Sequence, residues 1–402
     1  MASTDTALPS LGDLDVQGKR VLVRSDLNVP LKNGEITDDY RIRAALPTIL
    51  ELLERGARVI VCSHLGRPKG TVVEELRMAP VGRRLERLLG RPVETLDTVV
   101  GDTALAASMS QADVILLDNL RFEPGESAND PEFAKSLAKL ADCYVNDAFG
   151  SAHRAHASTV GIATLLPAAA GLLLENEVEK LSRILTDAES PFVAVLGGAK
   201  VSDKLAVIGN LLDRVDSLCI GGAMAFTLLV ARGEDVGRSL VEADRIEEVK
   251  AILAHADAKG VEVLLPDDVV AAVSPDEGAD HETVDLEAIG DRMGVDIGPK
   301  SALRFGDEIG RAKTILWNGP MGIFEIEAYA GGTKSVAEAV AAATRHGAYS
   351  VVGGGDSAAA LKQLGLDDQV SHLSTGGGAS LEFLEGIELP GIAALSKNER
   401  NA

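Results

Sequence analysis

The chain is poor in cysteine and in aromatic residues. Its 402 residues include three cysteines, one tryptophan and 3% aromatic residues. Cys62, Cys143 and Cys219 are odd in number and far apart, so they provide neither a disulfide framework nor the spacing of a zinc site. We expect them to be buried thiols in a reducing compartment.

Long apolar runs and an excess of basic residues are also missing. The longest apolar run, residues 165–174, is about half a membrane span and contains Pro167. The first residues lack the basic-then-apolar order of a secretory signal. The net charge of −22 argues against nucleic-acid binding. These absences predict a cytoplasmic protein that acts on small molecules, without membrane or nucleic-acid partners.

Two common nucleotide-binding motifs are absent or incomplete. No Gly-x-x-x-x-Gly-Lys-Ser/Thr run occurs, which excludes a P-loop enzyme. Gly353, Gly355 and Ala358 match the loose dinucleotide fingerprint, but no acidic residue ends the following predicted strand at 372–373. A nicotinamide-dependent oxidoreductase therefore stays only as an alternative.

Short apolar runs alternate with helical patterns along the whole chain, which predicts an α/β fold with parallel sheets. The length predicts two domains. The predicted strands of the first half are 20–23, 58–62, 113–117 and 142–145, with weaker candidates at Val93 and near Gly161. Those of the second half are 192–196, 217–220, 262–265, 314–316, 349–352 and 372–373. An amphipathic helix at 176–185 lies between the halves and suits a connector, although an ordinary helix of either domain fits the pattern equally well.

Four predicted strands of the first half are each followed by a loop that contains arginine. The loops are 24–30 (RSDLNVP), 63–68 (SHLGRP), 118–122 (DNLRF) and 146–154 (NDAFGSAHR). Ligands of open α/β sheets bind beyond the carboxyl ends of the strands, and arginine presents a planar fork to phosphate or carboxylate oxygens. We therefore expect an anion-selective basin there, which Arg41 at the next helix start could join.

Several side chains of these loops permit two interpretations. Asp26 and Asn28 suit a substrate hydroxyl, but Asp26 also suits a buried partner for a neighbouring arginine. His64 and His153 could donate to the anion or pack in the turns, and the sequence does not separate these roles.

The second half predicts a nucleotide site. Gly353-Gly354-Gly355-Asp356-Ser357 follows one predicted strand and opens a helix, an arrangement in which bare N–H groups approach a polyphosphate. Asp356 beside such a site suits Mg²⁺. The glycine runs around Gly222 and Gly377 offer further close backbone approaches, and Glu325 suits ribose hydroxyls or an ordinary helix start.

Lys200 and Lys204 follow another predicted strand and a glycine pair. Their i, i+4 spacing predicts that both lie on one helix face. A solvated face is the ordinary role of such a pair, but its position after a glycine turn favours phosphate contact.

Five long motifs resemble those of the phosphoglycerate kinase family. They are 24–30, 63–68, 196–204 (LGGAKVSDK), 317–322 (WNGPMG) and 353–357 (GGGDS), and they occur in the family's order and spacing across the whole chain. The chain departs from the family at Ser25, usually valine, and Asp118, usually glutamate, neither of which is an expected ligand.

The resemblance implies two doubly wound, Rossmann-like parallel-sheet domains that face each other across a cleft, in a monomeric enzyme. Residues 1–172 would bind phosphoglycerate, with the tail 388–402 returning to them, 173–188 would be the interdomain helix, and 189–387 would bind the nucleotide. The implied reaction transfers a phosphoryl group between 1,3-bisphosphoglycerate and ADP, giving 3-phosphoglycerate and ATP, directly in line and with hinge closure.

The resemblance also implies roles for individual residues. Arg41, Lys200, Gly354 and Gly377 would be catalytic. Phosphoglycerate would be bound by Asp26, Asn28, Arg41, His64, Leu65, Gly66, Arg67, Arg121 and Arg154. The nucleotide would be bound by Lys200, Lys204, Gly222, Gly294, Asn318, Glu325, Gly353, Gly354, Gly355, Asp356 and Ser357, and Mg²⁺ by Asp356. The alternative from another class is a non-catalytic anion-binding scaffold, for which both lysines, Asp356 and the arginine basin would have no use together.

Overall fold

The computed structural model describes residues 8–398, which divide into two compact units. Unit 1 contains the chain up to Glu179 and the segment from Glu388 onward, and unit 2 is Lys180–Ile387. Helix α6 (Leu172–Thr186) carries the chain from unit 1 into unit 2. Its observed start lies four residues before the predicted 176.

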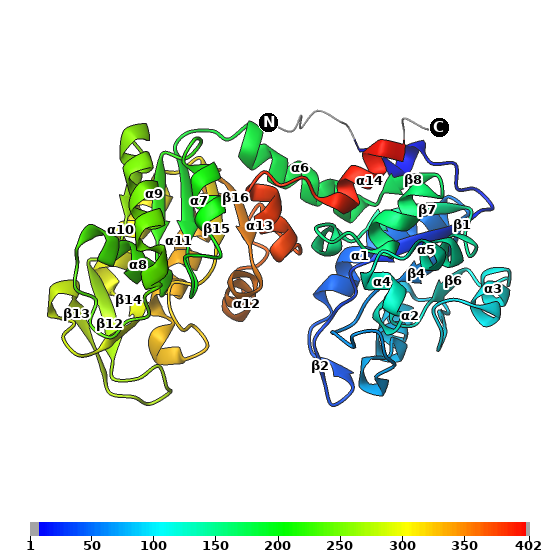
Figure 1. The fold of residues 1–402 in the computed structure, drawn as a ribbon, viewed down its shortest axis with the longest axis horizontal. Helices are drawn as coiled ribbons and strands as arrows, with labels where there is room; N and C mark the ends of the chain where they lie inside the picture. Colours follow the sequence, from blue (N-terminus) through cyan, green and yellow to red (C-terminus); the bar gives the residue numbers. More distant parts are fainter. Residues whose placement is uncertain (1–7, 399–402) are drawn as a thin grey trace. The chain divides into compact units, whose positions relative to one another are not determined.

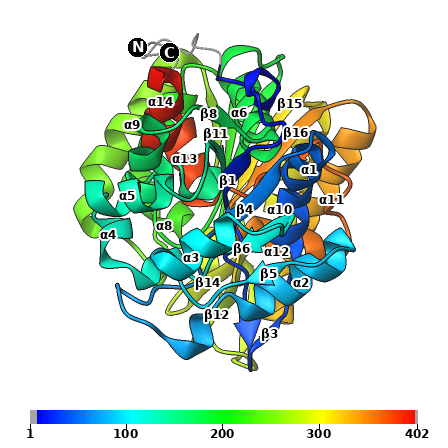
Figure 2. The same cartoon turned by 90° about the vertical axis from the view of Figure 1, so that its right-hand side faces the viewer.

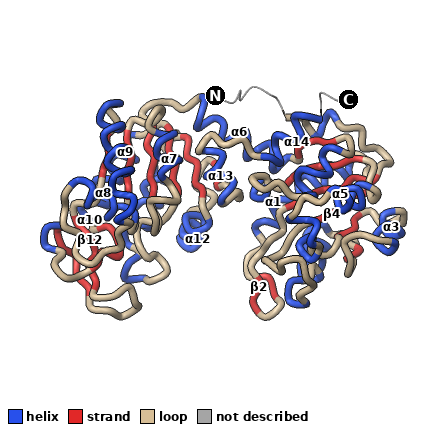
Figure 3. Tube along the Cα trace, viewed as in Figure 1, coloured by secondary structure: helices blue, strands red, loops and turns tan. Residues whose placement is uncertain are grey.

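Unit 1 is built on a six-stranded parallel sheet in the order β5-β6-β4-β1-β7-β8. Figure 3 shows its strands in red among helices in blue. Its strands are β1 (Arg20–Ser25), β4 (Arg58–Cys62), β5 (Glu94–Thr95), β6 (Val114–Leu116), β7 (Cys143–Asp147) and β8 (Ala168–Ala170). A hairpin of β2 (Leu31–Lys32) and β3 (Glu35–Ile36) follows β1. The helices are α1 (Tyr40–Glu54), α2 (Ala79–Leu89), α3 (Asp102–Ser108), α4 (Pro124–Ser127), α5 (Pro131–Ala138) and α14 (Pro390–Asn398).

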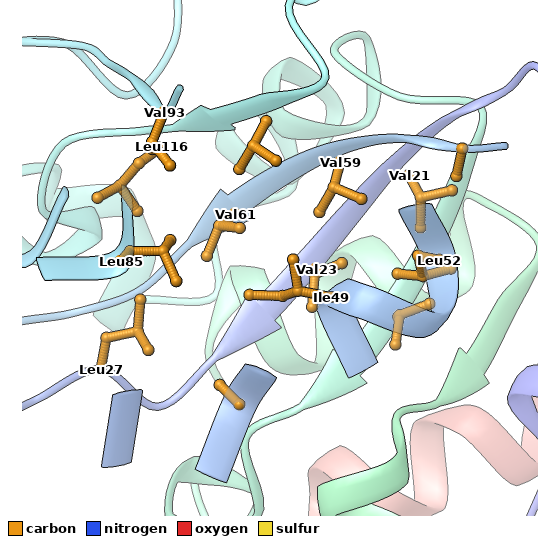
Figure 4. Packing of buried hydrophobic residues seen from close by; sticks show 14 of the residues in the cluster. Val21, Val23, Leu27, Ile49, Leu52, Val59, Val61, Leu85, Val93 and Leu116 are labelled. Atoms are coloured by element: carbon orange, nitrogen blue, oxygen red, sulfur yellow. The ribbon is translucent and has the colours of Figure 1, made fainter. Parts of the chain in front are cut away.

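The central strands of this sheet are almost continuous apolar runs because both faces are covered. Val21 and Val23 of β1 point toward Ile49 and Leu52 of α1, as Figure 4 shows, and all four side chains belong to one buried core. The buried positions of α1 recur at helical spacing, so one helix face covers the sheet.

The C-terminal segment completes unit 1. Helix α14 contacts β8, and the two lie side by side in Figures 1 and 2. The Gly391 N–H donates to the Ala152 carbonyl at 2.8 Å. A side chain at Gly391 would meet Ala152 backbone at 3.0 Å, so the segment and the β7 loop approach closely.

Unit 2 is built on a second six-stranded parallel sheet in the order β11-β10-β9-β15-β16-β17. The strands are β9 (Phe192–Leu196), β10 (Ser217–Ile220), β11 (Glu262–Leu264), β15 (Thr314–Asn318), β16 (Tyr349–Gly353) and β17 (His372–Leu373). The helices are α7 (Leu205–Leu211), α8 (Met224–Arg232), α9 (Ile246–Lys259), α10 (Pro299–Arg311), α11 (Gly331–Arg345), α12 (Gly355–Leu364) and α13 (Gly378–Leu384). In chain order the strands run 3-2-1-4-5-6, which is the dinucleotide-fold order.

The structure confirms the α/β class with parallel sheets but corrects two parts of the prediction. The segment near Gly161 is a short π-helix, Ala157–Gly161, and the edge strand is instead β8. Unit 2 also contains an antiparallel sheet that was not predicted, made of β12 (Asp268–Ala272), β13 (His281–Asp285) and β14 (Met293–Ile297). The buried Asp268 carboxylate accepts from the Ser301 N–H at 2.8 Å and so caps α10.

Candidate functional site

In unit 1 the four arginine-bearing loops lie at one edge of the sheet. They follow β1, β4, β6 and β7, which are parallel neighbours, so their carboxyl ends meet at the same edge. The chain order of the strands reverses between β1 and β7, which makes this edge a topological switch point. The structure therefore brings together the loops that the sequence predicts to form an anion basin.

Arg24 lies at the base of this basin with only 1% of its surface exposed. Its Nε donates to Ser158 Oγ at 3.0 Å, and its Nη2 donates to Ser151 Oγ at 3.2 Å and lies 3.0 Å from His64 Nδ1. The sequence pattern placed the loop 24–30 in the predicted basin, but Arg24 was not among the predicted ligands. Only the structure shows that it is buried against His64.

His64 is almost fully buried among positive charges. Burial lowers its pKa well below the usual value, and the charges of Arg24, Arg121, Arg41 and Arg154 lower it further. The His64 imidazole is therefore neutral, so it can contribute a hydrogen bond but no charge to anion binding.

The predicted phosphoglycerate ligands form several contacts with one another. Arg41 Nη1 forms an ion pair with Asp26 Oδ2 at 3.0 Å. Asp26 is therefore the partner of a neighbouring arginine, which is one of its two predicted roles. The Gly66 N–H donates to Asn28 Oδ1 at 2.8 Å, and Arg121 Nη1 donates to the Gly66 carbonyl at 2.7 Å. Burial, with Arg154 and Arg24 nearby, lowers the pKa of Arg121 to about 10.

The remaining predicted ligands of unit 1 differ in exposure. Leu65 is buried, and its N–H donates to Asn119 Oδ1 at 3.1 Å. Arg154 is half-buried, and its Nε donates to His153 Nε2 at 3.1 Å. Arg67 is exposed. Asn119, missed at the sequence level, is fully buried and supports the 63–66 loop, a role that only the three-dimensional contact reveals.

In unit 2 the switch point lies between β9 and β15, where backbones approach closely. The Gly197 N–H donates to the Asn318 carbonyl at 3.0 Å, and the Gly198 N–H donates to the Pro320 carbonyl at 2.9 Å. A Cβ on Gly222, whose φ is +66°, would lie 2.5 Å from Gly198 backbone atoms. A Cβ on Gly197 would lie 2.1 Å from the Pro320 carbonyl oxygen, so no side chain fits at Gly197 or Gly222, whereas Gly198 is favoured by its φ of +110°.

A cavity of about 440 Å³ opens beside this crossing. Its lining is mostly apolar and includes Phe226, Leu240, Met293 and Val295, and a cavity of this size and character suits a nucleoside. A Cβ on Gly294 would lie 2.0 Å from the Phe226 ring, so the bare backbone at 294 forms part of the cavity wall. Glu325 and Asp356 are the exposed carboxylates of the lining. Glu325 lies in the turn that leads into the 3-10 helix Glu327–Tyr329.

The structure contradicts the prediction that Lys200 and Lys204 share a helix face. The chain turns at 201–204, and α7 begins only at Leu205. Lys200 is exposed, whereas Lys204 is 8% exposed and its Nζ donates to Asn318 Oδ1. Burial lowers the pKa of Lys204 to about 8, opposed by the nearby carboxylates Asp203 and Asp356.

The glycine turn after β16 has the predicted strand, turn and helix order. β16 ends at Gly353, Gly354 has a φ of +91°, and α12 begins at Gly355. Ser357 Oγ accepts from the Gly319 N–H at 2.7 Å, which ties the turn to β15. Because Lys204 donates to Asn318 Oδ1, the amide Nδ2 is the remaining donor, and among the described residues this buried atom has no partner. It lies against Gly353 and Gly354, as a ligand-binding donor would.

The last predicted glycine, Gly377, precedes α13 with a φ of +54°. Within the part of the chain that the structure describes, no three His, Cys, Asp or Glu side chains group as metal ligands. A single carboxylate, Asp356 in the first turn of α12, fits a Mg²⁺ ion that would take its other ligands from a nucleotide and water. Among residues 8–398, no helix combines the length and apolar character needed to cross a bilayer.

The fold and these two sites define a class, that of an α/β phosphotransferase that uses a nucleotide. One Rossmann-like unit gathers arginines, which suit a small anion, at its switch point, and the other has a mostly apolar cavity whose lining includes Asp356 of the turn at the start of α12.

Comparisons with known proteins identify the family. The phosphoglycerate kinase family model matches residues 11–387. The phosphoglycerate kinase of Rubrobacter xylanophilus is 57% identical over 392 residues, which cover 97% of this chain and 98% of the relative. That of Dictyoglomus turgidum is 55% identical over 388 residues, covering 96% and 97%. The solved structure of phosphoglycerate kinase from Coxiella burnetii, 44% identical, has a TM-score of 0.85 and covers 97% of this chain and 99% of its own.

The chain belongs to the phosphoglycerate kinase family. Its activity is therefore the transfer of a phosphoryl group between a nucleotide and a carboxyl group, in the reversible reaction of 1,3-bisphosphoglycerate and ADP that gives 3-phosphoglycerate and ATP. The nicotinamide-dependent alternative is excluded by this membership.

Proposed function

We propose that the two substrates of this reaction bind to different units. Phosphoglycerate binds to the basin of unit 1 and the nucleotide binds to the cavity of unit 2. The observation that carries this division is the contrast between the two switch points. The unit 1 edge gathers Arg24, Arg41, Arg121 and Arg154 around His64, whereas the unit 2 edge is glycine-lined and mostly apolar.

In unit 1, Arg41, Arg67, Arg121 and Arg154 neutralise the phosphate and carboxylate groups of phosphoglycerate. Asp26 and Asn28 contact its hydroxyl, and the 64–66 loop contributes His64, Leu65 and the Gly66 backbone. The existing contacts of Asp26 with Arg41 and of Asn28 with Gly66 hold these groups in position before the substrate arrives.

In unit 2, the nucleoside occupies the cavity, with Gly222 and Gly294 in its walls and Glu325 at the ribose hydroxyls. The phosphates lie at the start of α12, where the N–H groups of 353–357 and the positive end of the helix face them. Lys200, Lys204 and Asn318 supply charge and a donor at the same end. Asp356 holds Mg²⁺, which neutralises phosphate charge when it is bound.

The transfer is direct and in line. In the direction that consumes ATP, a carboxylate oxygen of 3-phosphoglycerate bonds to the γ-phosphorus while the bond to the β,γ-bridging oxygen breaks, and ADP leaves with that electron pair. Such a step needs alignment and charge stabilisation rather than a protein nucleophile. Arg41, Lys200 and the N–H groups of Gly354 and Gly377 stabilise the oxygens of the moving group. Because these residues belong to two units, hinge closure must bring them together and exclude water.

We also propose that the enzyme acts as a monomer in the cytoplasm. Support for a reducing compartment comes from Cys62, Cys143 and Cys219, which are all buried free thiols. Light scattering after size-exclusion chromatography tests the monomer, for which a mass near 42 kDa is expected.

Arg67→Ala tests the assignment of substrates to units. A coupled assay of ATP formation from 1,3-bisphosphoglycerate should show activity in the wild type. The variant should raise the KM for the phosphoglycerate substrate roughly tenfold or more, because a charge-assisted contact is lost, with the KM for the nucleotide nearly unchanged. An effect on the nucleotide KM alone would contradict the proposed division.

A further inference from the structure

A buried chain of polar side chains lies behind the basin of unit 1. Arg24 Nε donates to Ser158 Oγ at 3.0 Å, and Ser158 Oγ donates to Glu126 Oε1 at 2.6 Å. The Ser158 N–H also donates to Glu126 Oε2 at 3.0 Å, and His156 Nδ1 lies 3.6 Å from Glu126 Oε1. Glu126, Ser158 and Arg24 are between 0% and 1% exposed, so solvent does not compete for these bonds.

The chemistry of the groups gives each bond a single direction. A guanidinium can only donate and a carboxylate can only accept, so Ser158 must accept from Arg24 and donate to Glu126. Burial alone would raise the pKa of Glu126, but His156, Arg24 and Ser158 lower it below its usual value. The carboxylate is therefore ionised and is the charge on which this hydrogen-bonded chain ends.

The same reasoning assigns the tautomer of His64. Arg24 Nη2 lies 3.0 Å from His64 Nδ1, and because the guanidinium donates, Nδ1 carries no proton. The charged groups facing the ring, Arg24, Arg121, Arg41 and Arg154, are all positive and keep it neutral. The single ring proton is then on Nε2, which leaves His64 one donor for an anion.

We propose that Glu126 is a positioning residue for phosphoglycerate binding: through Ser158 it orients Arg24, and through Arg24 it holds His64 as the neutral Nε2–H tautomer. The inference rests on the proposed function of the basin. Glu126 does not touch the substrate in this proposal. It supplies the buried negative charge that makes one orientation of Arg24, and therefore one face of His64, more stable than the others.

Glu126→Gln and Ser158→Ala test the chain at two points. Steady-state assays of the full-length enzyme, with 3-phosphoglycerate and MgATP as substrates, give a KM for each substrate. Nitrogen-15 NMR reports the tautomer of His64, assigned by comparison with His64→Gln. In the wild type His64 should be neutral with the proton on Nε2 from pH 6 to 8. Each variant should give a mixture of tautomers and raise the KM for phosphoglycerate about tenfold, with the KM for MgATP within about twofold.

Asp268→Asn is the matched control, because it alters a buried, hydrogen-bonded carboxylate in the other unit. It should lower thermal stability without changing the His64 signals or the KM for phosphoglycerate. If the His64 tautomer or the KM for phosphoglycerate stays unchanged in Ser158→Ala, the proposal is overturned, and Glu126 is only structural. Ser158→Ala keeps the experiment decisive even if Glu126→Gln fails to fold. If the basin does not bind phosphoglycerate at all, the variants would still change the His64 tautomer while the KM for phosphoglycerate stays the same. That outcome differs from an unchanged tautomer, so failure of the proposed function and failure of this inference are distinguishable.

Discussion

At the scale of single residues, Lys200 and Lys204 show how burial separates side chains that are equivalent in the sequence. Both follow one glycine pair, but Lys204 points inward to Asn318 whereas Lys200 is exposed. The spacing predicted a shared helix face because it assumed that the helix begins at the glycines. The turn at 201–204, in which the Lys204 N–H donates to the Val201 carbonyl at 2.9 Å, overrides that local pattern.

The lowered pKa of Lys204 predicts that kcat/KM for MgATP depends on pH. Its pKa of about 8 lies below the usual 10.5, so the free enzyme loses this charge as the pH rises through about 8. If the charged form binds the phosphates, kcat/KM for MgATP should fall above that pH. Lys204→Arg should move the decline to higher pH, because arginine stays charged. A profile that is flat from pH 7 to 9.5 in the wild type would remove Lys204 from phosphate binding.

Lys200 is tested by turnover rather than by pH. Lys200→Ala should lower kcat about 10²–10³-fold, the scale for losing a preorganised charge stabiliser. Because the side chain is exposed, thermal stability should change little. Near-normal turnover would show that another group stabilises the transferred phosphoryl.

At the scale of secondary-structure elements, strands rich in valine, isoleucine and leucine could be predicted from sequence. β4, β9 and β10 have the predicted bounds because a strand buried on both faces is a continuous apolar run. β8 could not be predicted, since Ala168–Ala170 has no strand preference. β13 was missed because His281–Asp285 is polar and mostly exposed, so it lacks the apolar run by which the other strands were predicted.

The first turn of α6 is held by a buried carboxyl group. Asp147, at the end of β7, accepts from the Leu173 N–H at 3.0 Å and thereby caps a helix that is remote in sequence. Burial raises the pKa of Asp147 to about 7, opposed by its bond to Thr48 and by the backbone N–H groups of α6. The folded protein therefore binds a proton there at a pH at which the unfolded chain does not.

The Asp147→Asn variant should gain stability relative to the wild type as the pH rises. The stabilisation from a raised carboxyl pKa is complete below the unfolded value near 4 and is lost as the pH rises through 7. Asparagine stays neutral, so the free energy of unfolding of the variant relative to wild type should increase by on the order of 2 kcal/mol between pH 5 and pH 8. Urea titrations at four pH values measure this.

Asp142→Asn is the comparison for that experiment. Arg20 lowers the pKa of Asp142, so this group titrates below the range and its variant should show no such gain. A difference between Asp147→Asn and wild type that is the same at every pH would contradict the assignment of a raised pKa to Asp147.

At the scale of the whole molecule, the substrates are assigned to separate units. The sequence predicted both sites because each is marked by short motifs at strand ends. It could not show which side chains are buried behind them, since Arg24 meets Ser158 across more than 100 residues of chain. Contacts of that kind leave no local pattern.

Closure of the units predicts a change in size on binding. The radius of gyration from small-angle X-ray scattering should fall when 3-phosphoglycerate and a non-hydrolysable MgATP analogue are both present. The reason is that the closed state is fully stabilised only when both ligands are bound. Either ligand alone should have a smaller effect. An identical radius in all four conditions would mean that transfer does not depend on hinge closure.

The return of the chain to unit 1 has a consequence for synthesis on the ribosome. Helix α14, which packs against β8, leaves the exit tunnel only after all of unit 2. Translation must therefore pass through all of unit 2 before the first unit can finish its packing, and nascent chains that stop before residue 390 lack the helix that covers β8.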